Sequence, residues 1–107
     1  MSDVRVCSVV DVPAGEARRF PVDGREVAVI NLGDDGFRAL DAICSHEHFY
    51  LDEGDVDVEE GTIECPKHGS EFDVETGAAR TLPAIKPVEI FPVTVTDDDV
   101  WIEVGGA

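Results

Sequence analysis

The chain has 107 residues, which is enough for one domain with a single hydrophobic core and too few for a second domain with its own chemistry. Its 24 acidic residues outnumber 8 basic ones, and the formal net charge of -16 makes nucleic acids and anionic membranes poor partners. The sequence lacks the basic start and long apolar stretch of a secretory signal, and no apolar run approaches membrane-spanning length, so we expect a cytoplasmic protein.

The first part of the chain predicts strands that are separated by turns. Residues 4–10, 16–22 and 25–32 predict strands, and the first and third of these runs are rich in β-branched residues. Residues 33–36, with the sequence GDDG, predict a hairpin turn from which residues 37–43 return.

Strands are predicted again toward the C-terminus. Residues 70–74 predict a strand that turns at residues 75–77, and a C-terminal hairpin is predicted from residues 88–96 and 100–104. Pro92 is expected at a sheet edge or a bulge, because proline has no N–H to donate to a strand ladder.

The fold class follows from the short strands and from the lack of any long 3.6-residue apolar period. We expect a single domain over residues 1–107, an all-β antiparallel sandwich or barrel with one helical turn near residues 48–51. Cys7 is expected to be a small buried side chain of the first strand. Trp101 is expected to pack in the core or at the edge of the last strand.

Two irregular segments carry the residues that can bind a metal. The first contains Cys44-Ser45-His46, a C-x-H, and the second contains C-x-x-H from Cys65 to His68, with 18 residues between His46 and Cys65. Each lies beside a predicted strand, so two thiolates and two imidazoles are presented from two loops. An odd number of cysteines without an export signal also favours ligation over a disulfide framework.

Three explanations of this pattern compete. The cysteines can be core residues and the histidines surface groups, although two such pairs in two loops make that a poor explanation. Two cysteines and two histidines also satisfy tetrahedral zinc, but zinc sites keep like ligands paired, whereas here each loop supplies one of each. A C-x-H spacing is short for chelating one ion and suits two ligands that reach two different metals.

The segments CSH and CPKHGSEFD resemble the signature of the Rieske [2Fe-2S] family, and nearly the whole chain resembles the small Rieske ferredoxins of ring-hydroxylating dioxygenases. The resemblance implies one [2Fe-2S] cluster per chain, held in a small subdomain of two loops at about residues 43–83. It makes Cys44 and Cys65 ligands of the inner iron, and His46 and His68 ligands of the outer iron. His48 falls outside the pattern and is expected to be an exposed loop residue.

The resemblance also implies how the reduction potential is set. High-potential members carry an extra cysteine in each loop, at positions that match Phe49 and Lys67 here. Those members also have a serine and a tyrosine whose hydroxyls bond to cluster sulfurs; Ser70 matches the serine, but Phe72 replaces the tyrosine. Because missing donors and nearby carboxylates disfavour reduction, we expect a potential near the low end of the Rieske range, roughly -150 mV.

A third segment is expected to lie near the cluster. Residues 82–87, LPAIKP, resemble the proline-containing loop that covers the cluster in this family, and the resemblance places Pro83 there. The alternative is an ordinary connector that is stiffened by its prolines.

The sequence contains no nucleotide motif or catalytic triad, and the resemblance implies an electron carrier rather than an enzyme. We expect transient, electrostatic docking to a flavoprotein reductase and a terminal non-haem iron dioxygenase, through an acidic rim formed by Glu47, Asp52, Glu53 and Glu71. The acidity has an alternative explanation in solubility or a salty cytoplasm. Alternative functions are a Rieske protein of another redox or cluster-assembly system and a structural-zinc interaction module.

Overall fold

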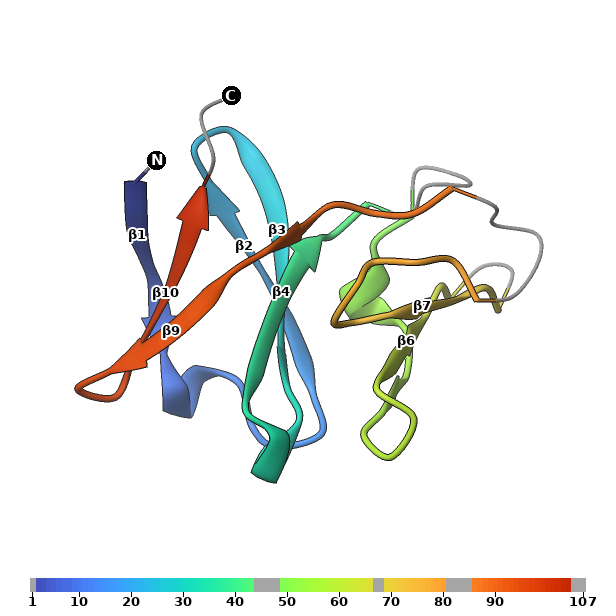
Figure 1. Cartoon of the computed structure of the whole chain (residues 1–107), viewed down its shortest axis with the longest axis horizontal. Coiled ribbons are helices and arrows are strands. Elements are labelled where there is room, and N and C mark those ends of the chain that lie inside the picture. Colours follow the sequence, from blue (N-terminus) through green and yellow to red (C-terminus); the bar gives the residue numbers. More distant parts are fainter. Residues whose placement is uncertain (1, 44–48, 67–68, 81–85, 105–107) are drawn as a thin grey trace.

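The computed structural model describes residues 2–43, 49–66, 69–80 and 86–104. Within these residues the protein consists of short antiparallel strands and three single-turn 3-10 helices, which confirms the predicted all-β class (Figure 1). The strands are β1 (Ser2–Ser8), β2 (Ala17–Val22), β3 (Arg25–Asn31), β4 (Phe37–Asp41), β5 (Val56–Asp57), β6 (Thr62–Glu64), β7 (Glu71–Asp73), β8 (Ile90–Phe91), β9 (Val93–Thr96) and β10 (Asp99–Val104). The 3-10 helices are η1 (Val9–Asp11), η2 (Gly33–Asp35) and η3 (Leu51–Glu53).

The strands form three sheets that lie side by side in Figure 1. One sheet has the order β1-β10-β9, the middle sheet has the order β2-β3-β4-β8, and the third has the order β5-β6-β7. The third sheet was not predicted as a unit, because strands of two or three residues are too short to show an alternating pattern. The expected two-loop subdomain therefore has a small sheet of its own.

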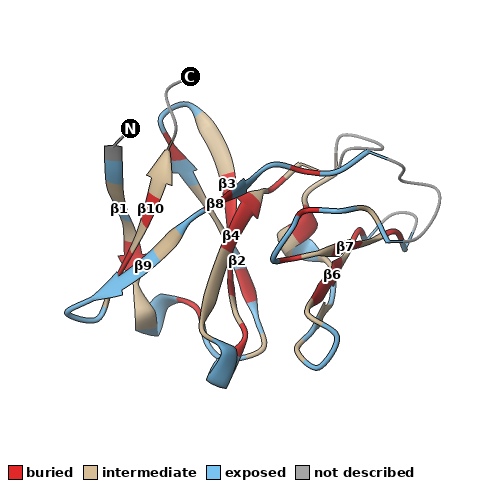
Figure 2. Ribbon diagram, viewed as in Figure 1, coloured by how far each residue is buried: buried red, intermediate tan, exposed pale blue. Residues whose placement is uncertain are grey.

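The middle sheet is covered on both faces, and residues 27–30 of its inner strand β3 are buried (Figure 2). Along β3, Val27 and Val29 join a core shared with β1 and β10, whereas Ala28 and Ile30 join a second core shared with β6 and β7. Successive side chains of a strand point to opposite faces, so four consecutive buried residues require two cores.

Pro92 divides what was predicted as one strand over residues 88–96. Residues Ile90–Phe91 pair with β4 in the middle sheet, and residues Val93–Thr96 pair with β10 in the first sheet. The chain therefore passes from one sheet to the other at Pro92. Pro92 was expected at a sheet edge or a bulge. It lies instead between two strands of different sheets, where no ladder needs the N–H that proline lacks.

Other boundaries differ by a few residues from the prediction. The first strand ends at Ser8, and residues 9–11 form a 3-10 turn rather than continuing the strand to residue 10. The predicted helical turn is η3, which begins at Leu51. Cys7 is buried, as expected, and Trp101 lies partly exposed opposite Arg5 and Thr94. No helix among the described residues is long and apolar enough to span a membrane.

Candidate metal centre

Each of the two motif segments is closed by a backbone pair. The first is closed by an isolated antiparallel bridge between Ile43 and Tyr50, and the second by the pair of Glu64, at the end of β6, with Glu71, at the start of β7. The structure thus places the ends of both loops. Of the residues singled out in these two segments, Cys44, His46, Glu47, His48, Lys67 and His68 lie outside the described ranges.

Cys65 lies in a tight turn just after β6. Its backbone N–H donates to the carbonyl of Ser70 at 2.7 Å, and its carbonyl accepts from the N–H of Gly69 at 3.0 Å. Gly69 has a φ of +74°, in the left-handed region that glycine adopts without strain. The side chain of Cys65 is fully buried, so the turn holds a thiol away from water.

The bases of both loops pack into one hydrophobic core. That core includes Ala42 before the first loop and Cys65 at the second, with Phe49 and Tyr50 packed against it. It also includes Phe72 and Val88, the latter just after the residues 82–87 that were expected to cover the cluster. The two motif segments therefore rise from the same core, as a shared centre requires.

Ser70 and Phe72, the two residues expected to tune the cluster, are fully buried. Ser70 follows Gly69 in the turn, and the backbone of Ser70 bonds to that of Cys65. Phe72 packs in the same core as Cys65. Both residues lie away from water, where a hydrogen bond is electrostatically stronger than in solvent. A single hydroxyl donor there can therefore change the free energy of adding an electron to a cluster. Pro83, expected in the covering loop, lies outside the described residues.

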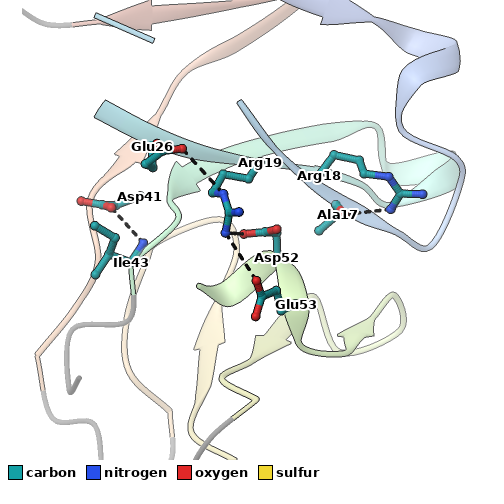
Figure 3. A network of polar contacts seen from close by, with 8 residues as sticks. All are labelled: Ala17, Arg18, Arg19, Glu26, Asp41, Ile43, Asp52 and Glu53. Carbon is teal, nitrogen blue, oxygen red and sulfur yellow. Dashed lines mark hydrogen bonds and ion pairs between the residues drawn. The ribbon is translucent and has the colours of Figure 1, made fainter. Parts of the chain in front are cut away.

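Hydrogen bonds fix the start of the first loop to the middle sheet. The Oδ1 atom of Asp41 accepts from the N–H of Ile43 at 3.0 Å (Figure 3). The N–H of Ala42 donates to the carbonyl of Glu26, and the carbonyl of Ala42 accepts from the N–H of Leu51. Residues 41–43 are thus bound on both sides before the chain enters the loop.

The end of the first loop is bound by Arg19 of β2 (Figure 3). The guanidinium of Arg19 stacks over the ring of Tyr50, with its Cζ atom 3.6 Å from the ring centroid. It also pairs with Asp52 at 3.5 Å and with Glu53 at 3.6 Å. Burial raises the pKa of Asp52, and the charge of Arg19 opposes that shift.

The segment that follows residues 82–85 is bound by Arg25. Its guanidinium donates to Glu89 at 2.6 Å and lies 3.7 Å from Asp41. This hydrogen bond lowers the pKa of Glu89. The N–H of Val88 donates to the carbonyl of Gly77. The chain that follows residues 82–85 is thereby tied to the end of β4 and to the turn after β7.

Carboxylates gather beside the second loop. Glu64 and Glu71 stand directly opposite each other on β6 and β7, a cross-strand pair of like charges. An open hollow next to them is also lined by Asp55, Asp57 and Glu59. The acidic surface predicted near the loops therefore includes residues that were not named from the sequence.

One residue of the predicted acidic rim is placed differently. The side chain of Asp52 is only 12% exposed and faces Arg19, so its charge is partly neutralised and does not belong to an open rim. Glu53 also pairs with Arg19 but is 58% exposed. Glu47 lies outside the described residues.

The donor set of the two motifs and the placement of Cys65 both fit a bound iron-sulfur cluster. The donor set of the two motifs is two thiols and two imidazoles, the set that a Rieske cluster takes. The one donor that the structure describes, Cys65, is buried in a turn at the base of a core shared by both loops. Sequence reasoning missed Arg19, because its contacts near the first loop, Tyr50, Asp52 and Glu53, are more than thirty residues away in the chain.

Comparisons with known proteins show which family the whole chain resembles. A family model described as the Rieske [2Fe-2S] domain matches residues 2–92. The chain is similar to the 3-phenylpropionate/cinnamic acid dioxygenase ferredoxin subunit of Escherichia coli (strain K12), with 37% identity over 103 residues that cover 96% of this chain and 94% of the relative.

Solved structures show the same similarity. The ferredoxin of carbazole 1,9a-dioxygenase from Nocardioides aromaticivorans IC177 matches with a TM-score of 0.90 and 37% identity, over 95% of this chain and 97% of that one. A chain from the complex of reduced oxygenase and oxidized ferredoxin in carbazole 1,9a-dioxygenase matches with a TM-score of 0.85 and 35% identity, over 94% of this chain and 91% of that one.

Proposed function

The chain belongs to the Rieske [2Fe-2S] domain family, and from that premise we propose that it passes single electrons from a flavoprotein reductase to a terminal non-haem iron dioxygenase. It is an electron-transfer component with a [2Fe-2S] cluster rather than an enzyme, like the dioxygenase ferredoxins it resembles over nearly its whole length. The dioxygenase partner is inferred from the names of these relatives and from the solved oxygenase–ferredoxin complex.

The observation that carries this proposal is the common base of the two motif loops. Cys65 is buried in its turn, and the flanks of both loops share one core. We assign Cys44 and Cys65 to the inner iron, and His46 and His68 to the outer iron. When bound, a [2Fe-2S] cluster held by these four residues would supply a one-electron couple, which is the chemistry that an electron carrier needs.

Single substitutions test the ligand assignment. His46→Ala and His68→Ala should each remove iron and abolish the rhombic electron paramagnetic resonance signal of the reduced cluster. His48→Ala is the matched control in the same loop and should leave both unchanged. The assignment is wrong if His48→Ala loses the signal while His46→Ala keeps it.

The proposed docking surface is the acidic region beside the second loop, and docking there is transient and electrostatic. Opposite charge on a partner would speed encounter, and salt would screen it. A variant that combines Glu64→Gln with Glu71→Gln should slow electron transfer to the oxygenase at low salt. Its control combines Asp34→Asn with Asp35→Asn, which removes two charges from the η2 turn. Equal slowing by both variants would argue for a general charge effect instead of docking beside the loop.

The domain and compartment are proposals of the same kind. We propose one domain over residues 1–107 with its cluster-binding part at about residues 43–83, because the family match spans most of the chain. We propose a cytoplasmic location, because Cys7 is a buried thiol of the kind that a reducing compartment maintains.

The family match favours the cluster over the zinc alternative, while a Rieske role in another redox system is tested by the choice of oxygenase partner.

A further inference from the structure

Arg19 occupies a place between the middle sheet and the first motif loop. It lies on β2, on the face that Ala17 shares with the core beneath both loops. From there its guanidinium stacks on Tyr50, which closes the first loop by its bridge to Ile43. The strand is part of a six-residue ladder with β3, so Arg19 projects from a rigid base.

The contacts of Arg19 converge on the residues that follow the loop. Its Nη1 atom lies 3.5 Å from Asp52 and 3.6 Å from Glu53, and its Nε atom lies 3.6 Å from Glu26 of β3. A guanidinium can stack on an aromatic ring and pair with carboxylates at its edge at the same time, which an ammonium cannot do as well. Figure 3 shows Arg19 with Glu26 of the sheet and with Asp52 and Glu53 of η3. Together with its contact to the ring of Tyr50, Arg19 therefore connects the sheet, the closing tyrosine and η3.

The burial of these groups makes the contact set more than a surface ion pair. The side chain of Arg19 is 30% exposed and that of Asp52 only 12%. An exposed ion pair contributes little to stability, but a carboxylate that is largely out of water is costly without its cation. Loss of Arg19 would leave Asp52 to regain water, and η3 would move with it.

We propose that Arg19 is a positioning residue for the first ligand loop, holding Tyr50 and η3 against β2 so that Cys44 and His46 keep the geometry that retains the cluster. The proposal rests on the ligand assignment made above. Arg19 acts through Tyr50 and η3, and it fixes the end of the loop, as the Asp41 hydrogen bond fixes its start.

The test measures how fast the oxidised holo-protein loses its visible absorption in the presence of an iron chelator. Arg19→Gln removes the charge and the planar stack. Arg19→Lys keeps the charge but not the stacking plane. Arg38→Gln is the matched control. Arg38 is 28% exposed, close to the value for Arg19, and it pairs with Glu75 near the start of β4, at the other end of that strand from Asp41.

We expect Arg19→Gln to lose its cluster about tenfold faster than the wild type, a factor consistent with the loss of one cation–π contact and three ion pairs. Arg19→Lys should recover part of this factor, and Arg38→Gln should release the cluster at the wild-type rate even if it lowers thermal stability equally. The reduced signal of Arg19→Gln should broaden, because a loosely held loop gives the histidine ligand several orientations.

A double-mutant cycle with Tyr50→Leu separates positioning from general destabilisation. If Arg19 acts through the ring, the two substitutions together should accelerate release by less than the product of their single effects. The proposal is overturned if Arg19→Gln and Arg38→Gln release the cluster at the same rate, or if the effects of Arg19 and Tyr50 multiply. A wild-type protein without the rhombic signal would instead refute the proposed function, so the two failures are distinguishable.

Discussion

Replacing Gly54 by alanine should separate the two segments that hold the proposed ligands. Gly54 ends η3, after the first loop, and it lies against the backbone of Glu64 just before Cys65. A methyl group at Gly54 would lie 2.8 Å from the carbonyl carbon of Glu64 and nearer still to its oxygen, whereas ordinary contacts begin at 3.4 Å. It would also meet Pro66 at 3.3 Å.

The cost of this substitution is steric rather than conformational. The φ of Gly54 is -92°, which alanine adopts without strain. Overpacking against backbone atoms that cannot rotate away places the cost at about 3 kcal/mol or more, the upper end for inserted methyl groups. Because Glu64 also donates its N–H to the carbonyl of Asp55, moving β6 away would break a hydrogen bond next to the second loop.

Urea unfolding and iron per chain measure the two consequences. Gly54→Ala should lower the unfolding midpoint and reduce the bound iron. Gly61→Ala is the control, because Gly61 has a φ of +68° with open space around it, so alanine there costs only about 1 kcal/mol of backbone strain. If Gly54→Ala keeps its iron and unfolds like Gly61→Ala, the close approach of the two segments does not support the site.

Three further predictions follow from buried or paired groups. Phe72→Tyr should raise the reduction potential in a redox titration by about 60 mV, the equivalent of ~1.4 kcal/mol, if its hydroxyl reaches a sulfur, and Ser70→Ala should lower it; an unchanged potential in Ser70→Ala would refute a hydroxyl bond from that residue. Cys7 should resist iodoacetamide in the folded protein at about pH 8, because burial, with the Asp11 carboxylate second, raises the pKa of its thiol to about 11; rapid labelling detected by mass spectrometry would contradict this. Glu89→Gln should lower the free energy of unfolding by less than about 1 kcal/mol at neutral pH, where the wild-type carboxylate is ionised and bonded to Arg25. Because that bond lowers the folded-state pKa of Glu89, its contribution is present above the unfolded value of 4.5 and is lost as the pH falls through the folded value, so an equal difference at acidic pH would count against the pairing.

Elements with a local signal were predictable from the sequence. The hairpin that joins β3 to β4 has an apolar run with three β-branched residues and a GDDG turn, and the C-terminal hairpin has β-branched runs around three aspartates. The motif pair could be recognised in the sequence for a different reason. Its spacing restricts which metals the four donors can share, and that restriction is independent of the fold.

The remaining features depend on partners that are distant in sequence. Pro92 marked an interruption, but only the pairing of β8 with β4 and of β9 with β10 shows that the chain changes sheets there. Asp52 was expected in an exposed rim, because nothing near it in the sequence indicates that Arg19 covers it. Likewise, no local pattern marks Gly54, since its constraint comes from the backbone of Glu64.

The most direct test of the electron-carrier function is the visible and electron paramagnetic resonance spectroscopy of the purified protein before and after dithionite. The two cysteines and two histidines of the motif loops predict a brown protein whose reduced form gives a rhombic signal with a low average g value. A colourless protein that contains stoichiometric zinc after anaerobic purification would contradict the cluster and, with it, the electron-carrier function.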